Sequence, residues 1–213
     1  MTRLLTVLAH PDDAEIWAGG TIISQVQQGN KALICSLAGH RDSTRGREAI
    51  EGAQVLGAEV VLLNQPDRQI VASERLIQEL RKILLDFSPD IIITHWEQDS
   101  HPDHVHCHKA IQAAIIATAG QSGTIRLFLQ CDTYLGTGRT ELFFPEIYVD
   151  VSKVWPEKLQ AIRRHASQEP EHYVEIVEHQ CWLHGARARV RYAEGFRRLP
   201  LYGRLGGATH QLL

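Results

Sequence analysis

Two short stretches of the sequence place histidine and carboxylate side chains at spacings that suit metal chemistry. The first, His10–Asp13, reads HPDD and follows the apolar segment Leu4–Ala9. The second reads HPDH and carries His101 and His104. Adjacent carboxylates repel and raise each other's pKa, so the two aspartates of HPDD call for a compensating charge. A divalent cation supplies that charge and lets imidazole and carboxylate groups share a small space.

These residue types match a catalytic zinc centre, in which three protein ligands leave a fourth position for water. His10 and Asp13 would supply two ligands from one turn, and one histidine of HPDH would supply the third. The metal makes the water acidic, and Asp12 is the spare carboxylate that could accept its proton. The histidine of HPDH that is not a ligand would stabilise the oxyanion or protonate a departing amine.

Each stretch also has a simpler explanation when it is taken alone. Asp12 or Asp13 could merely cap the following helix, because aspartate is common at the N-cap. His106 and His108 could be polar positions on a helix. His108 is also a rival third ligand, because it lies four residues after His104.

The other histidines and a glycine pair are not expected to carry the chemistry. Gly19–Gly20 lacks the pattern of a dinucleotide-binding fingerprint and is expected to allow either close packing of a helix on a strand or close approach of the backbone near the site. Six further histidines are expected at surface or packing positions: His40, His165, His172, His179, His184 and His210.

The apolar pattern predicts the elements that must position these side chains. Short apolar segments alternate with helical patterns, which is typical of an α/β fold whose mostly parallel, Rossmann-like sheet is covered by helices on both faces. We expect strands at Leu4–Ala9, Lys31–Ala38, Glu59–Asn64, Asp90–Trp96, Arg126–Asp132 and Glu146–Ser152, and a short strand or turn at Tyr192–Phe196. We expect helices at Glu15–Gln28, Arg45–Leu56, Ser73–Phe87, Asp103–Ala119, Pro156–Ser167 and His172–Ala188.

The order of these elements predicts that the two polar stretches meet. HPDD follows the first expected strand, and HPDH follows the fourth. Ligands of open parallel sheets bind beyond the carboxyl ends of the strands, so both stretches should lie at the same edge. This convergence is stronger evidence for a metal site than either stretch alone. Ser73 is expected to cap one helix, and Gly29 and Gly57 to end two others.

Length and composition narrow the class of protein. The 213 residues fit a single domain, residues 1–213, and 44% hydrophobic with 22% charged residues is typical of a globular protein. The formal net charge of −3 gives no basic field for nucleic acid or a membrane surface. The four scattered cysteines predict no disulfide framework. With no signal peptide and no membrane span expected, we expect a cytoplasmic protein.

The motifs together resemble the LmbE-like, or PIG-L, family of metal-dependent N-deacetylases. AHPDD, the following Glu15 and GG, and the later HPDH carry most of the resemblance. Weaker matches extend it over nearly the whole chain: Arg45 and Glu48, PDR at Pro66–Arg68, DVS near Asp150, SQ at Ser167–Gln168 and YAEGF at Tyr192–Phe196. These later motifs are similar to the bacterial branch of the family.

The resemblance implies a Rossmann-like fold, one Zn²⁺ or in some members Fe²⁺, and removal of an acetyl group from an N-acetylglucosaminyl small molecule. It implies His10, Asp13 and His104 as metal ligands, with Asp12 as general base. His101 would then be the electrostatic partner and a candidate acid, and related enzymes are often trimers or hexamers.

Substrate choice is the part that the sequence leaves open. By resemblance, Arg45 would bind substrate, either sugar hydroxyls or an anionic aglycone, and His40 and Arg41 of the same loop could also face the substrate. The loop AGHRDSTRG departs from the family pattern there. An amidase for larger amides such as thiol conjugates, and a non-catalytic metal- or sugar-binding protein, remain the alternatives.

Overall fold

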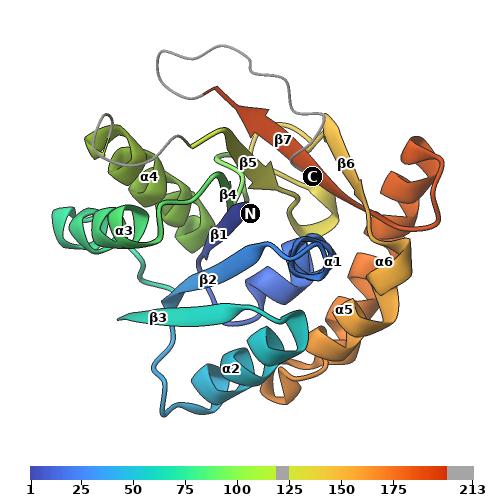
Figure 1. Ribbon diagram of the computed structural model, residues 1–213, viewed down its shortest axis with the longest axis horizontal. Coiled ribbons are helices and arrows are strands. Elements are labelled where there is room, and N and C mark those ends of the chain that lie inside the picture. The colour runs from blue at the N-terminus through green and yellow to red at the C-terminus, as the bar shows by residue number, and fades with distance from the viewer. Residues whose placement is uncertain (119–124, 201–213) are drawn as a thin grey trace.

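The computed structural model describes residues 1–118 and 125–200, and its centre is a seven-stranded sheet with helices on both faces (Figure 1). The strands are β1 (Arg3–Leu8), β2 (Lys31–Ala38), β3 (Glu59–Gln65), β4 (Ile91–Thr94), β5 (Leu127–Cys131), β6 (Ile147–Asp150) and β7 (Ala193–Leu199). The α-helices are α1 (Asp13–Gln27), α2 (Thr44–Leu56), α3 (Glu74–Phe87), α4 (Pro102–Ala117), α5 (Trp155–Ile162) and α6 (Pro170–Ala188). Short 3₁₀ turns lie at Tyr134–Gly136, Ser152–Val154 and Ala166–Gln168.

The strand order is β3-β2-β1-β4-β5-β7-β6, which confirms the expected Rossmann-like, mostly parallel sheet. Strands β3, β2, β1, β4 and β5 run parallel, whereas β7 is antiparallel to both β5 and β6. The chain moves outward from β1 in one direction through β2 and β3, then returns to place β4 on the other side of β1. The carboxyl ends of β1 and β4 therefore border the crevice where the strand order reverses.

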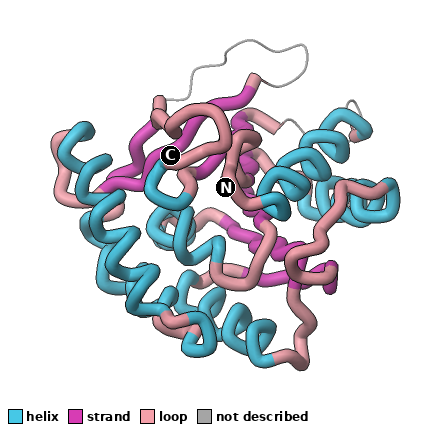
Figure 2. The backbone as a smooth tube through the Cα atoms, turned by 180° about the vertical axis from the view of Figure 1, so that it is seen from behind, coloured by secondary structure: helices cyan, strands magenta, loops and turns pink. Residues whose placement is uncertain are grey.

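Alternating side chains of the inner strands divide the core between the two faces. In β1, Leu4 and Leu8 belong to one buried cluster, and Leu5 and Val7 belong to the other. Helices α1, α2, α5 and α6 contribute to the first cluster, whereas α3 and α4 contribute to the second. Both helical layers are seen from behind in Figure 2. Continuously apolar strands are explained by this burial on both faces.

The helix ends predicted at Ser73 and Gly57 are confirmed. The Ser73 side chain accepts a hydrogen bond from the Leu76 backbone N–H, and Gly57 ends α2 in the left-handed conformation. Gly20 faces β6 and its following turn so closely that an added Cβ would lie 2.5 Å from Val151 Cγ1. Gly20 thus serves the close packing of α1, whereas a Cβ on Gly19 would make only ordinary contacts, the nearest at 3.5 Å.

The expected helix at 156–167 is wrong in its second half. Helix α5 ends at Ile162, and the chain turns before the 3₁₀ segment Ala166–Gln168. The turn buries His165, and Glu48 of α2 accepts hydrogen bonds from both the backbone N–H and the hydroxyl of Ser167. These tertiary contacts outweigh the local helical preference.

The segment Tyr192–Phe196, expected as a short strand or turn, belongs mostly to β7, which pairs with β5 on one side and β6 on the other. Two expectations fall outside the described residues: the end of a helix at Ala119 and the surface or packing position of His210. Within the described ranges, no helix is long and apolar enough to cross a membrane.

Candidate metal and active site

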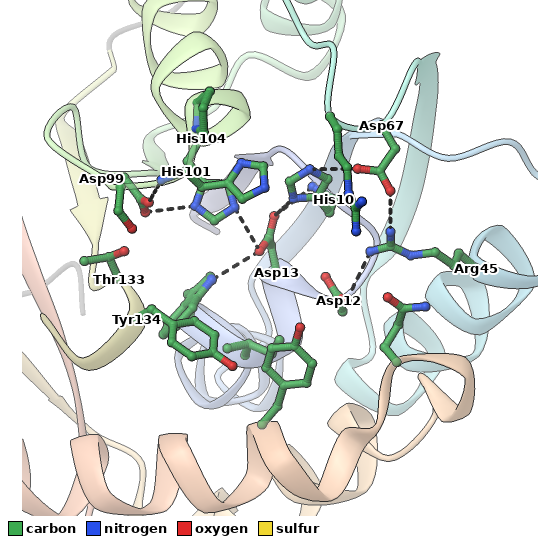
Figure 3. A pocket seen from close by; sticks show the side chains of 17 residues that line it. His10, Asp12, Asp13, Arg45, Asp67, Asp99, His101, His104, Thr133 and Tyr134 are labelled. Atoms are coloured by element: carbon green, nitrogen blue, oxygen red, sulfur yellow. Dashed lines mark hydrogen bonds and ion pairs between the residues drawn. The ribbon is translucent and has the colours of Figure 1, made fainter. Parts of the chain in front are cut away.

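The two polar stretches meet at the crevice between the carboxyl ends of β1 and β4. HPDD forms the turn from β1 into α1, and HPDH spans the start of α4. Figure 3 shows His10, Asp13, His101 and His104 directed toward a common space. Asp12 and Arg45 flank it on one side.

Asp13 lies at the centre of this space and is held by contacts on several sides. Its Oδ2 accepts a hydrogen bond of 2.7 Å from the backbone N–H of His10, and its Oδ1 accepts one of 3.2 Å from the indole of Trp17. Its Oδ1 also lies 3.6 Å from His104 Nε2, and its Oδ2 lies 3.3 Å from His10 Nδ1. The carboxylate begins α1, where the helix dipole favours negative charge.

Asp12 adopts an unusual backbone conformation, with φ of 117°. It stands at the N-cap position of α1, but its side chain makes no capping hydrogen bond. The capping interpretation is therefore wrong for Asp12. Positive φ at a non-glycine residue costs on the order of 1–3 kcal/mol and is often found at functional sites. Here it turns a buried carboxylate away from the helix and into the cavity.

The HPDH stretch begins a helix and presents two imidazoles. His101 is the N-cap of α4, and its Nδ1 accepts a hydrogen bond from the Asp103 backbone N–H. The neutral ring therefore carries its proton on Nε2. His104 lies one turn further along and points its Nδ1 at Asp99 Oδ2, 2.8 Å away. The ring of His104 stacks against His101 at a centroid distance of 4.7 Å.

One combination of these side chains satisfies the requirements of a metal site. His10, Asp13 and His104 each offer a ligand atom, and the three atoms lie within 4.8 Å of one another. Two imidazoles and one carboxylate are the donor set of many catalytic zinc sites, so the side chains fit such an ion. His101 with His10 and Asp103 forms a second candidate group, and His95 with Asp99 and His104 forms a third.

The rival ligand His108 lies elsewhere. Its Nδ1 is 3.1 Å from the carbonyl oxygen of His95, and its ring stacks on Phe128. It belongs to none of the candidate groups found among the described residues. His106 is directed at the backbone N–H of Ala72, 3.4 Å away.

Arg45 contacts the HPDD turn rather than standing free. Its Nη2 donates to the carbonyl of Pro11 and lies 3.2 Å from Asp12 Oδ2, and its Nη1 lies 2.7 Å from Asp67 Oδ2. Its Nε has no hydrogen-bond partner within the described chain. The guanidinium thus ties Asp12 to the loop after β3. His40 and Arg41 do not line the cavity.

A cavity of about 450 Å³ opens over the site. All six residues singled out from the sequence line it: His10, Asp12, Asp13, Arg45, His101 and His104. Aromatic side chains form another wall, where Trp17 meets Tyr134 edge to face at 6.2 Å and Tyr134 meets Tyr173 in the same way. Such a cavity, polar at its floor and aromatic on one side, is large enough for a sugar derivative.

The electrostatics of the floor separate the roles of the two neighbouring aspartates. Burial and the charge of Asp13 raise the pKa of Asp12 to about 7, although Arg45 opposes the rise. Burial acts on Asp13 too, but nearby imidazoles, first among them His104, hold its pKa well below the usual range. One carboxylate is therefore a poised proton acceptor near neutral pH, and the other is a permanent anion.

The sequence reasoning missed several residues of the site. Asp99 and His95 lie between β4 and α4. Their nearness to HPDH in the sequence was the only signal that could have identified them. Asp67 was noted only as part of the PDR motif. Tyr134 and Tyr173 come from distant segments, and no local signal could have identified them. Two of the six histidines expected at surface or packing positions are buried beside carboxylates, His165 near Glu15 and His184 near Asp132. A third, His210, lies outside the described residues.

Comparison with known proteins places this geometry in a family. The family model described as PIG-L, GlcNAc-PI de-N-acetylase, matches residues 5–115, which is just over half of the chain. The diacetylchitobiose deacetylase of Thermococcus kodakarensis is 27% identical, over 93% of this chain and 83% of its own length. The 4-oxalmesaconate hydratase of Pseudomonas putida KT2440 is 26% identical, over 91% of this chain and 87% of its own length. The structure of N,N'-diacetylchitobiose deacetylase from Pyrococcus horikoshii superposes with a TM-score of 0.79 at 24% identity, covering 99% of this chain and 89% of that one.

Proposed function

Because this chain belongs to the PIG-L family, we propose that it is a metal-dependent N-deacetylase acting on a small molecule that contains N-acetylglucosamine. The observation that carries the proposal is the meeting of His10, Asp13 and His104 at the floor of a cavity that Asp12 and His101 also line. The deacetylase names of the relatives support the same reaction.

His10, Asp13 and His104 would hold the metal. Zinc suits this donor set, and Fe²⁺ is served by the same ligand types. When bound, such an ion acidifies water and polarises the amide carbonyl. A 27%-identical relative supports the chemistry but does not fix the metal.

The protein's own side chains would manage the protons. Asp12 accepts a proton from the water that attacks the acetyl carbonyl carbon, and its raised pKa suits that task near pH 7. His101 presents Nε2–H to the carbonyl oxygen as that atom gains negative charge. The proton on Asp12 then passes to the leaving nitrogen, so that acetate and a free amine are the products.

The surroundings would orient the sugar. Tyr134 and Tyr173 offer apolar ring surface to a pyranose face, and Gln168 lines the cavity with an amide. The Gln168 amide nitrogen donates to Ser167, which leaves its oxygen as the group available to sugar hydroxyls. Arg45 uses its Nη atoms to contact Asp67, Asp12 and the carbonyl of Pro11, and it would reach substrate through the N–H groups that these contacts leave over, Nε–H among them.

Two variants test the proposal. Asp12→Asn should bind the metal as the wild type does but release acetate about 10²–10⁴-fold more slowly, which is the usual contribution of a general base. His104→Ala should lose both metal and activity. Metal per chain is measured by elemental mass spectrometry, and acetate release is followed on a panel of N-acetylglucosaminides. Near wild-type turnover in Asp12→Asn would refute its role as the base.

The hydratase among the relatives makes water addition the second candidate. Its 26% identity over 91% of the chain is close to that of the deacetylase relative. Incubation with 4-oxalmesaconate, followed by mass spectrometry of the product, separates the two reactions. Larger amides belong in the same panel, because the acyl group released distinguishes an amidase from a deacetylase. Affinity for these compounds without turnover would indicate a binding protein.

A further inference from the structure

We propose that Asp99 is a positioning residue that makes His104 competent to bind the metal. The inference rests on the proposed function, since it concerns the same metal site. The contacts of the Asp99 side chain are with His104 and the backbone of His101, not with the other two proposed ligands. It acts through His104 and the start of α4.

One carboxylate organises both histidines of HPDH. Asp99 Oδ2 lies 2.8 Å from His104 Nδ1, and Asp99 Oδ1 accepts a hydrogen bond of 2.7 Å from the backbone N–H of His101. The Asp99 side chain is only 2% exposed, so water does not compete strongly for either contact.

The contact decides which nitrogen of His104 is free. An ionised carboxylate only accepts hydrogen bonds, so His104 Nδ1 must carry the proton. The lone pair is then on Nε2, which faces Asp13 Oδ1 at 3.6 Å. Metal-bound histidines usually donate their other ring N–H to a carboxylate or carbonyl, which fixes the tautomer and raises the basicity of the ligand.

The plane of the ring is fixed as well. The buried His95 ring stacks on His104 at a centroid distance of 3.6 Å and an angle of 7°. Stacking alone would let the ring rotate within its own plane or turn over. The hydrogen bond to Asp99 removes that freedom and directs Nε2 toward the site.

Asp99 can do this because its loop is itself anchored by a distant segment. Asp99 bridges to Gly138, and the backbone N–H of Arg139 donates to the carbonyl of Gln98 over 2.7 Å. A Cβ on Gly138 would lie 2.3 Å from the ring of Trp96, so the two segments approach as closely as glycine allows. The loop after β5 therefore supports the metal ligand on α4.

Asp99→Asn is the discriminating substitution. An amide offers one acceptor, whereas two donors, the His101 backbone N–H and His104 Nδ1–H, now face the carboxylate. If the amide oxygen of the variant keeps the hydrogen bond from the His101 backbone N–H, the amide NH₂ group faces His104 Nδ1. That donor favours the His104 tautomer that accepts at Nδ1 and carries its proton on Nε2, which blocks Nε2 as a ligand. The opposite orientation sets two donors against each other at His101.

The expected result is a zinc affinity about 10–100-fold weaker than that of the wild type, as for other residues that orient metal ligands. Affinity is measured on the full chain, stripped of metal, by competition of Zn²⁺ with a coloured chelator. Co²⁺ provides a second readout, because the visible spectrum of bound cobalt should change with the field of His104. Circular dichroism and the unfolding midpoint of the metal-free variant check that the fold is kept.

Glu97→Gln is the matched control, because Glu97 is a carboxylate of the same loop that lies 3.6 Å from His108 Nε2 rather than near His104. It should bind zinc as the wild type does. Asp99→Ala, made in parallel, should also lose at least tenfold in affinity, so the test survives if the amide variant does not fold. Wild-type affinity and an unchanged cobalt spectrum in folded Asp99→Asn would overturn the inference while leaving the proposed function intact. Absence of zinc binding by the wild type would instead overturn the proposed function and the inference together.

Discussion

Replacing Lys158 tests how α1, the helix that begins at the candidate site, is held in place. Lys158 is fully buried in α5, and its ammonium donates to Glu194 Oε1 at 2.6 Å and to the carbonyls of Glu15 and Ile16 at 3.0 and 2.6 Å. Glu194, on β7, is 2% exposed and also accepts from two backbone N–H groups of α1. The pair thus joins α1, which begins with Asp13, to two other elements.

Lys158→Met keeps most of the side-chain volume but removes the charge. The substitution leaves the Glu194 carboxylate buried without its counter-ion and two carbonyls of α1 without their donor. Breaking a buried ion pair on one side costs about 3–5 kcal/mol. For a chain of this length, each kcal/mol corresponds to about 2–4 °C in Tm, so we expect a fall of about 6–20 °C. Urea unfolding gives the free energy, and a thermal scan gives Tm.

Two further variants isolate the cause. Lys153→Met removes an exposed lysine from the turn before α5 and should change the free energy of unfolding by less than about 0.5 kcal/mol. Lys158→Met combined with Glu194→Gln should be more stable than Lys158→Met alone, because no unpaired charge stays buried. Additive losses in the double variant, or a loss below about 1 kcal/mol in Lys158→Met, would refute this reasoning.

Two further outcomes are expected from other parts of the fold. Gly39→Ala places a Cβ 2.7 Å from Pro11 Cγ at φ of +90°, whereas the control Gly29→Ala also has a positive φ but places its Cβ with no atom within 4 Å. Gly39→Ala should therefore lower the free energy of unfolding by more than the roughly 1–2 kcal/mol expected for Gly29→Ala, and it should also slow catalysis. Equal losses of unfolding free energy in the two variants would contradict the Pro11 contact. Burial lowers the pKa of His165, but the nearby Glu15 carboxylate outweighs burial and raises the pKa above 6.5. The protonated ring therefore stabilises the folded state below pH 6.5, and this stabilisation is lost as the pH rises through the raised pKa. The difference in unfolding free energy between wild type and His165→Gln should accordingly be largest below pH 6.5, and urea titrations across pH 5–9 that show a constant difference would count against the Glu15 pairing.

Local sequence signals were sufficient for most of the fold. Apolar strands separated by helical periods specify the parallel sheet, because strands buried on both faces must be apolar throughout. Ser73 and Gly57 marked helix ends because capping depends on side chains within one turn. The break after Ile162 was not predictable in this way, because the contact between Glu48 and Ser167 joins residues 119 positions apart.

The same division applies to the candidate site. HPDD and HPDH were identifiable because both lie at strand ends that the strand order brings to one edge. The choice of His104 over His108 came from family resemblance. Among the described residues, His104 forms a candidate metal group with His10 and Asp13, and His108 does not. Spacing alone could not decide it, since both histidines lie on α4.

By itself, the sequence determined the α/β class, the residue types of a candidate metal site and the edge of the sheet where they gather. Those properties follow from periodicity and chain order, which are local or topological. Only the tertiary structure decided that Asp12 turns away from its helix, that Arg45 is bound to Asp12 and Asp67, and that Asp99 faces His104. These depend on distances of a few ångströms between side chains from different loops, and such distances are set by packing rather than by the order of residues in the chain.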